Sequence, residues 1–467
     1  MPVRNSLYPG AKRAKPVTTF NARGVIVSPA FTLSMPAGLV GPVRFTVHAH
    51  PVPGGWIAEP SWSVDEGALQ GSHELPHKHS KQLTTRSEAV ELALSRGIRQ
   101  MQAMLGKAAH DAKWQKRFEQ LRHWQAEAMR EVRANDESLP LRGLTGIDLF
   151  AGGLGGLSLG MVSMGMRIAL ACEIDPEARR IYQRNIQPEH LLDDIRTLLA
   201  ECKRQGIPLR ADIVTMGLLC QAFSKAGKGL GFADPKLAAA YAAAMEVLEA
   251  VDAKVLLIEC ARQFLTHDGG KDARALIDRL TRAGYRVQHR SLNAAGFGVA
   301  QSRERSFIVA TRIGLNVDDI LGYLFPEEQQ PTAVVGDVMD AGLPATIEAK
   351  RITPHAPAPA GRVGELAQVG RIDGKNCQGY RAYSPNGLGA TLTATGGGAA
   401  RFTGAYEVPG GARTLTPREA ARLQGLPEWA EVHPVQTHAM RHAGNAVAVP
   451  LARELVRQLG PVLRRAA

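Results

Sequence analysis

Cysteine is scarce in this chain, and no two cysteines stand close together. The 467 residues contain five, at Cys172, Cys202, Cys220, Cys260 and Cys377. None forms the C-x-x-C pair that is typical of a structural zinc site, and an odd number cannot all be paired in disulfides. The sequence therefore predicts neither a disulfide scaffold nor a metal site, and it favours a reducing, cytoplasmic compartment.

Long apolar runs are also missing. A membrane-spanning helix needs about 18 or more consecutive apolar residues, and no such stretch is present. The basic start, MPVRNSLYPGAKRAKP, is not followed by an apolar run of signal-peptide length. We therefore expect no membrane association.

The charge is strongly unbalanced. Lysine and arginine number 56 and aspartate and glutamate 44, so the net charge is 56 − 44 = +12. A basic surplus of this size favours a polyanionic partner, usually nucleic acid, although it could also serve solubility alone. With 45% hydrophobic residues the chain can bury a sizeable core, and its length predicts two or three domains.

Residues 1–140 differ from the rest. Short β-rich runs, punctuated by Gly and Pro, lie between residues 18 and 62, and a helix is expected after Thr85 or Ser87. A longer helix over 108–133 has an apolar stripe made of Trp114, Phe118 and Leu121. Basic residues surround it, at Lys113, Lys116, Arg117, Arg122 and Arg130. This helix either contacts nucleic acid or is a solvated helix docked by its stripe.

From residue 143 short apolar strands alternate with helical segments. This alternation predicts a doubly wound α/β sheet buried on both faces. After Arg312 the pattern dissolves into a stretch rich in Gly, Pro, Ala and Thr, and helical patterns return at TPREAARLQGL and PLARELVRQL.

Two motifs indicate a nucleotide-like cofactor. In GIDLFAGGLGGLSLG, residues 146–160, an apolar strand runs into a Gly-rich turn that opens a helix. Such a turn brings backbone amides close to a ligand. The next strand ends in CEID, with Glu173 and Asp175, where an acid commonly binds ribose hydroxyls. The alternative to cofactor binding is that the glycines only allow the turn to pack tightly against neighbouring helices and strands.

Three further motifs place reactive groups at strand ends. Cys220 follows the strand ADIVTMGLL, and a basic, Gly-rich stretch after it is expected to be a loop that closes over a phosphate backbone. Glu259 ends the apolar strand LLIEC, where burial would raise its pKa and suit a general acid. In QSRERSFIVATR, Arg303 and Arg305 alternate and share one face.

The order of these motifs resembles that of the DNA (cytosine-5) methyltransferase family. The family's C-terminal blocks are also present, as RTLTPREAARLQGLPE at 413–428 and GNAVAVP at 444–450. The resemblance covers residues 143–467. It implies a Rossmann-like methyltransferase sheet, S-adenosylmethionine as cofactor, and methylation of carbon 5 of cytosine in duplex DNA.

The resemblance also implies residue roles. Cys220 aligns with the nucleophile, Glu259 with the acid that protonates the ring nitrogen, Arg303 with a group holding the cytosine, and Arg305 with a second catalytic arginine. Residues that align with the cofactor site are Phe150, Gly152, Gly153, Gly155, Gly156, Glu173, Ile174, Asp194, Asn445 and Val447. Residues expected to bind the substrate are Gln221, Ser224, Lys225, Gln301, Thr391 and Leu392.

These matches predict a domain order: an N-terminal α+β module at 1–140, a catalytic domain at 141–312, a small irregular target-recognition domain at 313–430, and a return to the catalytic domain at 431–467. The expected partner is double-stranded DNA, with a cognate restriction endonuclease possible, and we expect a nucleoid-associated monomer. The alternatives are a non-catalytic DNA-binding relative and an RNA cytosine-5 methyltransferase.

Two departures from the family pattern bear on rate. Leu218 and Leu219 stand where the family has two prolines before the nucleophile, and Cys260 replaces an asparagine. Loss of the fixed proline φ is expected to loosen the turn that aims the thiol. The sequence therefore predicts a working but slow enzyme.

Overall fold

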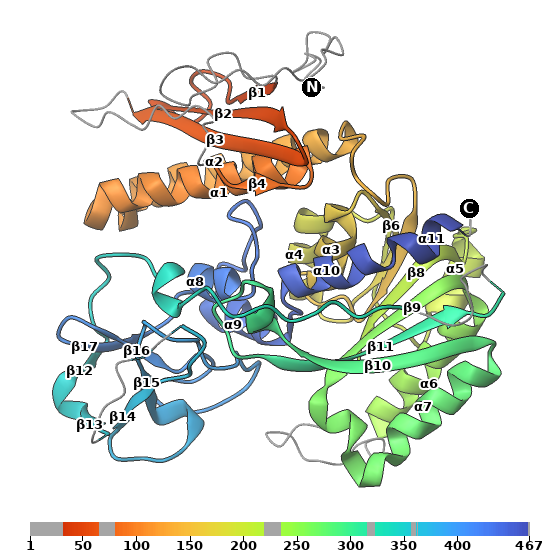
Figure 1. Ribbon diagram of the computed structural model, residues 1–467. Coiled ribbons are helices and arrows are strands. Elements are labelled where there is room, and N and C mark those ends of the chain that lie inside the picture. The colour runs from red at the N-terminus through yellow and green to blue at the C-terminus, as the bar shows by residue number, and fades with distance from the viewer. Residues whose placement is uncertain are drawn as a thin grey trace. The chain divides into compact units, whose positions relative to one another are not determined.

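The chain divides into two compact units. The computed structural model describes residues 31–64, 80–218, 235–314, 323–355, 361 and 363–465. The first unit is Met1–Leu139 together with Pro427–Ala430, and the second is Pro140–Leu426 with Glu431–Ala467 (Figure 1).

The first unit contains a four-stranded antiparallel sheet. Its strands, in spatial order, are β1 Phe31–Ser34, β2 Val43–Val52, β3 Gly55–Val64 and β4 Gln82–Leu83. Phe45 of β2 pairs with Trp62 of β3, and both side chains are buried. Alternation along the strands places these residues on one face. The β-rich runs that fall on described residues therefore form an antiparallel meander, whereas residues 18–30 lie outside the described part of the chain.

Two helices follow, α1 Arg86–Leu105 and α2 Ala112–Ala134. Thr85 is the N-cap of α1 and forms a capping box with Glu88, as the sequence indicated. A Cβ on Gly97 would lie 2.2 Å from the Phe45 ring, so only glycine permits α1 to approach the sheet this closely.

The apolar stripe of α2 is buried. Trp114, Phe118 and Leu121 all face the interior, which confirms that this helix is docked by its stripe. Arg122 is buried as well, whereas Lys113 and Lys116 are exposed. A contact of this helix with nucleic acid stays a prediction.

A short segment distant in sequence completes the first unit. Trp429 is only 2% exposed, and the guanidinium of Arg133 lies 5.2 Å from the centre of its ring. The carboxylate of Glu428 lies 3.9 Å from the guanidinium of Arg122. The first unit therefore needs Pro427–Ala430 to fill its core.

Replacing Trp429 by alanine should destabilise the first unit. Removing a buried aromatic ring costs about 3–5 kcal/mol of unfolding free energy. Hydrogen exchange of the α2 amides in the full chain measures this loss. The control is Leu39→Ala, because Leu39 is 46% exposed and its loss should change little. Equal exchange in both variants would contradict a core role for Trp429.

The second unit is built on a seven-stranded sheet with the order β10-β11-β9-β8-β5-β6-β7. Its strands are β5 Thr145–Leu149, β6 Arg167–Cys172, β7 His190–Leu192, β8 Arg210–Gly217, β9 Asp252–Ala261, β10 Tyr285–Asn293 and β11 Glu304–Arg312. The first five are parallel, and β11 is antiparallel to both β9 and β10. This mostly parallel, doubly wound sheet confirms the predicted Rossmann-like fold.

Helices cover both faces of this sheet (Figure 1). The α-helices described in this unit are α3 Gly156–Ser163, α4 Pro176–Ile186, α5 Leu198–Gln205, α6 Pro235–Ala250, α7 Lys271–Arg282, α8 Pro417–Leu423, α9 Gln436–Asn445, α10 Val449–Gln458 and α11 Gly460–Arg465, of which α8 and α9 lie beside the sheet and not over its faces. Side chains of α5, α6 and α7 form an apolar cluster with side chains on one face of the sheet. On the other face α10 lies against α3, where a Cβ on Gly160 would meet Ala452. Helix α10 thus packs against the helix that begins in the Gly-rich motif at 146–160.

A second sheet lies between β11 and α8 in the sequence. Its six strands are β12 Ile347–Glu348, β13 Ile352–Pro354, β14 Gln368–Ile372, β15 Arg381–Tyr383, β16 Ala405–Val408 and β17 Gly411–Thr414. They enclose a small core that includes Ile347, Ile372 and Ala405. The strands are two to five residues long, which is too short for an alternating pattern to stand out in the sequence.

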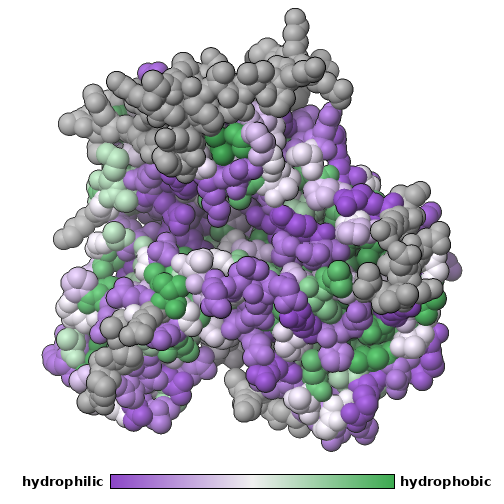
Figure 2. Space-filling model, viewed as in Figure 1, coloured by the Kyte–Doolittle hydropathy of each residue, from purple (hydrophilic) through white to green (hydrophobic). Residues whose placement is uncertain are grey.

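Hydrophilic residues predominate on the visible face, and hydrophobic residues form small separate groups (Figure 2). Among the helices that the structure describes, none has the length and apolar character to cross a bilayer.

Candidate active site

The strand order of the sheet reverses between β5 and β8. From β5 the chain passes to β6 and β7 on one side, then returns to β8 on the other. In open α/β sheets such a reversal leaves a crevice at the carboxyl-terminal ends of the strands, where ligands bind. The Gly-rich turn begins at this point, directly after Leu149.

The backbone of the turn is unusual. Phe150 has φ of 56° and Gly152 has φ of 66°, and Gly155 is a left-handed N-cap of α3. A positive φ is uncommon in a bulky residue such as phenylalanine and marks a conformation held by its surroundings. The amide of Ala151 donates to the carbonyl of Cys172 at 3.0 Å, which ties the turn to β6.

At most positions of the turn, glycine is required by the close approach of another part of the chain and not by a ligand. A Cβ on Gly153 would lie 2.6 Å from His442, one on Gly155 would meet Tyr182, and one on Gly156 would lie 2.1 Å from the Val447 carbonyl. A Cβ on Gly152 would meet nothing within 4 Å. Close approach of elements therefore explains three glycines, and Gly152 alone has open space beside it. Their contact with a cofactor stays a prediction.

Glu173 is joined to this turn. Its carboxylate accepts hydrogen bonds from the amide of Gly152 at 2.8 Å and from the amide of Asp175 at 2.9 Å. Burial raises the pKa of Glu173, and these two hydrogen bonds oppose the rise. Ile174, the next residue, is 62% exposed, which is unusual for a large apolar side chain. A fixed acid thus lies beside a free apolar surface.

The remaining expected cofactor residues are distributed around the same strand edge. Asp194 follows β7, and its hydrogen bonds with Arg196 lower its pKa. Asn445 ends α9 and is exposed, whereas Val447 is buried with its carbonyl next to Gly156. Because β5, β6 and β7 are parallel, their carboxyl-terminal ends meet at one edge.

A second group lies at the ends of β9 and β11. Glu259 is 4% exposed, and the guanidinium Nε of Arg305 lies 3.1 Å from its carboxylate. Burial raises the pKa of Glu259, while Arg305 and then Arg303 oppose the rise. The amide of Leu218, two residues before Cys220, donates to the carbonyl of Glu259 at 2.8 Å. Cys220, Gln221, Ser224 and Lys225 lie outside the described residues.

Arg303 has a different environment from Arg305. Its guanidinium is buried and donates to the carbonyls of Leu392 at 3.1 Å, Gly444 at 2.9 Å and Ala446 at 2.9 Å. These bonds join separate chain segments, and the guanidinium of Arg305, not that of Arg303, forms the ion pair with Glu259. The contact of Arg303 with the target cytosine that the resemblance implies stays a prediction.

Gln301, Thr391 and Leu392 were expected to contact the substrate, and the structure joins them to one another. Gln301 accepts from the amide of Leu392 at 2.9 Å and donates to the carbonyl of Leu423 at 3.0 Å. The hydroxyl of Thr391 donates to the carbonyl of Ser302 at 2.5 Å. In the structure these residues connect β11 to α8 and to the second sheet. A direct substrate contact stays a prediction.

Replacing Arg303 by lysine should lower the free energy of unfolding by about 2–4 kcal/mol, because one ammonium cannot serve three carbonyls in two segments. The matched variant Arg305→Lys keeps a cation beside Glu259. Compared with Arg303→Lys, it should lower the free energy of unfolding less and the methylation rate more. Urea denaturation and single-turnover rates distinguish the two. If Arg303→Lys lowers the free energy of unfolding less than Arg305→Lys does, the guanidinium of Arg303 does not hold these segments together.

Asp148 in β5 is a buried acid near the Gly-rich turn that was not predicted from the sequence. Its carboxylate accepts from the hydroxyls of Ser158 and Thr215, each at 2.6 Å, and the Ser158 hydroxyl also contacts that of Tyr182 at 2.6 Å. Burial raises the pKa of Asp148 from 3.8 to about 6. The sequence contained a signal for it, namely an acid inside the otherwise apolar strand GIDLF. A buried carboxylate is costly unless it is hydrogen-bonded, so an acid at this position indicates a buried hydrogen-bond network.

Asp148→Asn should change how stability depends on pH. Between about pH 4 and 6 folded Asp148 keeps a proton that the unfolded chain has released, so its contribution to stability falls as pH rises through this window. Relative to wild type, the asparagine variant should gain up to about 3 kcal/mol between pH 4 and 7. Urea denaturation at several pH values measures this difference, with exposed Asp193→Asn as control. A difference independent of pH would contradict the assignment.

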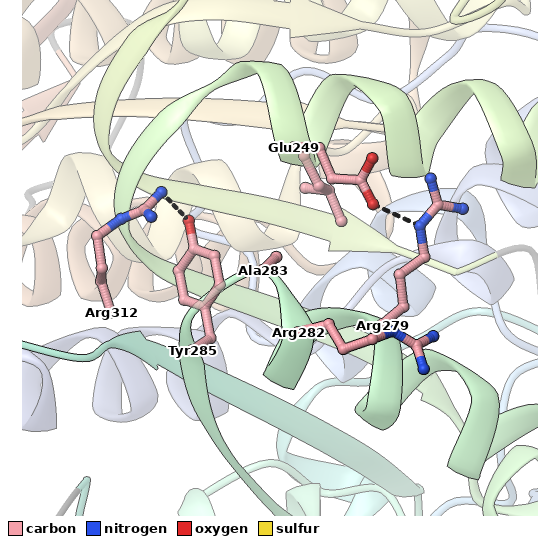
Figure 3. Close-up of a pocket in the computed structure, with 7 residues that line it drawn as sticks. Glu249, Arg279, Arg282, Ala283, Tyr285 and Arg312 are labelled. Carbon is pink, nitrogen blue, oxygen red and sulfur yellow. Dashed lines mark hydrogen bonds and ion pairs between the residues drawn. The ribbon is translucent and has the colours of Figure 1, made fainter.

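A cavity of about 540 Å³ lies at the opposite edge of the sheet, where β10 begins and β11 ends. Figure 3 shows Arg279 paired with Glu249 and Arg312 hydrogen-bonded to the hydroxyl of Tyr285. Helices α6 and α7 both end here, and cations are favoured at helix C-termini. The helix ends thus explain these arginines, and the cavity is far along the strands from the Gly-rich turn.

No metal site is found among the described residues, since no group of three or more His, Cys, Asp or Glu side chains is arranged to hold an ion. Of the five cysteines, Cys172, Cys202, Cys260 and Cys377 are described, and these four are free thiols.

The chain is similar to known proteins over the whole second unit. The family model described as C-5 cytosine-specific DNA methylase matches residues 144–461. Type II methyltransferase M.HhaI of Haemophilus parahaemolyticus is 32% identical over 329 residues, covering 69% of this chain and 96% of that protein. Type II methyltransferase M.NgoBI of Neisseria gonorrhoeae is 31% identical over 315 residues, covering 65% of this chain and 89% of that protein.

Solved structures show the same fold. A putative DNA modification methyltransferase encoded within an E. coli prophage is 21% identical, with a TM-score of 0.50, covering 69% of this chain and 100% of that chain. The S. pombe Dnmt2 methyltransferase is 19% identical, also with a TM-score of 0.50, covering 68% of this chain and 98% of that chain.

Proposed function

Since the chain belongs to the family of C-5 cytosine-specific DNA methylases, we propose that it methylates carbon 5 of cytosine in duplex DNA through a covalent adduct with Cys220. Enzymes of this family use S-adenosylmethionine, which supplies a methyl group activated by a sulfonium. The observation that carries the proposal is the buried Glu259–Arg305 pair beside Leu218, at the same sheet edge as Glu173 and the Gly-rich turn.

The residues at the first group of strand ends fit this cofactor. Glu173, held by two amides at the end of β6, suits the hydroxyls of a ribose. Exposed Ile174 offers an apolar surface to a purine, and the space beside Gly152 admits a ligand close to the backbone. We assign Phe150, Asp194, Asn445 and Val447 to the wall of the same site.

The second group fits the base. Carbon 5 of cytosine is a poor nucleophile, and attack of the Cys220 thiolate on carbon 6 converts the ring to an enamine. Glu259 donates a proton to nitrogen 3, which offsets the developing charge. A raised pKa keeps Glu259 available as a donor, and Arg305 holds its carboxyl group in place. Carbon 5 of the enamine would then take the methyl group that the sulfonium of a bound cofactor supplies, and the sulfonium would leave as a neutral thioether. Loss of the carbon 5 proton to a base, with cleavage of the bond between sulfur and carbon 6 and return of the nitrogen 3 proton to Glu259, would free the thiolate.

Duplex DNA is proposed as the substrate because the chain is basic and has a separate second sheet. A base inside a duplex must be flipped out before it reaches such a site, at a cost of a few kcal/mol. The net charge of +12 favours phosphate contacts that offset this cost. The second sheet, β12 to β17, is a surface available for reading sequence beside the catalytic sheet.

The residues near the nucleophile that differ from the family pattern lie in different environments. Leu218 is buried at the end of β8, and Cys260 is 1% exposed, with its thiol 3.6 Å from the carbonyl of Ser306. An asparagine at 260 would bring an amide into the apolar cluster that Cys260 shares with Ile258. We therefore expect Cys260→Asn to cost stability. The slow rate proposed from Leu218 and Leu219 stays a prediction.

Covalent trapping tests the mechanism. Bisulfite sequencing of DNA from cells expressing the protein identifies the target site, and a duplex with 5-fluorocytosine at that site should then form a denaturation-resistant complex with the enzyme and S-adenosylmethionine. Fluorine cannot leave as a proton does, so elimination is blocked. Cys220→Ala should abolish the complex, and Glu259→Gln should slow methylation by about 100-fold or more while cofactor binding persists.

Cys377→Ala is the matched control, because this exposed cysteine should leave trapping unchanged. Methylation by Cys220→Ala would refute the covalent mechanism. DNA binding without any methylation would favour a non-catalytic relative, and methylation of a structured RNA in preference to the duplex would favour an RNA enzyme. A cognate restriction endonuclease and a monomeric state remain predictions.

A further inference from the structure

Three histidines gather beside the Gly-rich turn. His438 and His442 lie one turn apart on α9, and His433 precedes this helix. The rings of His433 and His438 stack with centres 4.6 Å apart, and that of His442 lies edge-on to His433 at 5.8 Å. None of the three was assigned a role from the sequence.

His442 closely approaches the turn. A Cβ on Gly153 would lie 2.6 Å from its Nδ1 and 2.8 Å from its Cγ, so the imidazole lies directly against the backbone of the turn. Gly153 immediately follows Gly152, whose amide donates to Glu173. The ring of His442 therefore supports the segment that is expected to meet the cofactor.

The two other histidines are engaged elsewhere. His433 lies 2.7 Å from the carboxylate of Glu177 and 3.0 Å from the guanidinium of Arg180, both on α4. His438 is half-buried and stacks on His433. The cluster thus joins α9 to the helix that follows Glu173.

His442 has both ring nitrogens buried without a hydrogen-bond partner among the described residues, and its side chain is 3% exposed. His433 is hydrogen-bonded, and in His438 only Nδ1 is buried without such a partner. Burial lowers the pKa of His442 to about 4; Asp175 opposes this, and Arg441, His433 and His438 add to it. The ring is therefore neutral near pH 7, with one donor and one acceptor nitrogen.

Buried polar atoms without partners are rare, because such an atom loses its hydrogen bonds to water on folding and gains none in return. An apolar side chain of similar size would support the turn without that cost. A histidine at this position is explained if the ligand brings a hydrogen-bond partner for one of the ring nitrogens. The turn that His442 contacts borders the expected cofactor site, so the cofactor can supply this partner.

We propose that His442 is a further residue of the cofactor site, which supports the Gly152–Gly153 backbone and hydrogen-bonds through a ring nitrogen to the bound S-adenosylmethionine or to a water held by it. This inference rests on the cofactor placement proposed above. The interaction needs both the bulk and the polarity of the side chain, so the two contributions can be separated by substitution.

Calorimetric titration of the full chain with S-adenosylmethionine, without DNA, provides the test. His442→Ala removes bulk and polarity, and His442→Phe keeps a ring without nitrogens. Each should weaken binding about tenfold, the loss expected for one hydrogen bond. His442→Gln restores a neutral donor and acceptor and should bind within about threefold of wild type. In wild type, ¹⁵N resonances should report a neutral His442 ring near pH 7, and one of its nitrogens should shift when the cofactor is added.

His438→Ala is the matched control, on the same helix and in the same cluster but without the contact to Gly153; its affinity should stay within about threefold of wild type. Glu173→Ala checks the placement of the site and should weaken binding. If wild type and Glu173→Ala behave as expected but His442→Ala and His442→Phe bind like wild type, this inference is wrong and the proposed function stands. If His438→Ala weakens binding equally, the cluster acts only through folding and the inference is also wrong. If wild type does not bind, the proposed cofactor site fails, and this inference with it.

Discussion

A guanidinium group buried just before β11 holds together segments that are far apart in the sequence. Arg303 donates to the carbonyl of Leu392, between strands β15 and β16 of the second sheet, and to those of Gly444 and Ala446 at the end of α9. Main-chain carbonyls in an apolar interior need donors, and one planar guanidinium can serve several at once. Gln301 adds bonds to Leu392 and Leu423. The second sheet and the C-terminal helices are thereby joined to the end of the catalytic sheet.

This junction lies at the edge where the reactive groups meet. The parallel strands β5, β6, β8 and β9 all end at one edge, and antiparallel β11 begins there. Residues after each strand therefore converge although they are separated by up to 150 positions or so in the chain, as open α/β sheets require. Glu173 and the Gly-rich turn lie on one side of the reversal in strand order, and Glu259 with Arg305 on the other.

Buried acids are a shared feature of this edge, and each is stabilised differently. Asp148 is held by hydroxyl groups, Glu173 by backbone amides and Glu259 by Arg305. Burial raises the pKa of all three, and the partners limit the rise. Hydroxyls carry no charge, whereas a guanidinium is always cationic, so a carboxylic acid belongs to a buried hydrogen-bond network at Asp148 and is the proposed general acid at Glu259.

The sequence by itself determined the α/β fold class, because alternation of apolar strands with helices is a local signal of a mostly parallel sheet covered by helices. It also located Glu173, Glu259 and the Gly-rich turn, since motifs at strand ends keep fixed spacing to the strand. Only the tertiary structure decided which arginine pairs with Glu259 and which binds carbonyls, because Arg303 and Arg305 alternate identically along the chain. It alone also brought His442 against Gly153, 289 positions earlier in the numbering (442 − 153). Contacts between segments so distant depend on how helices pack, and side-chain periodicity carries no information about that.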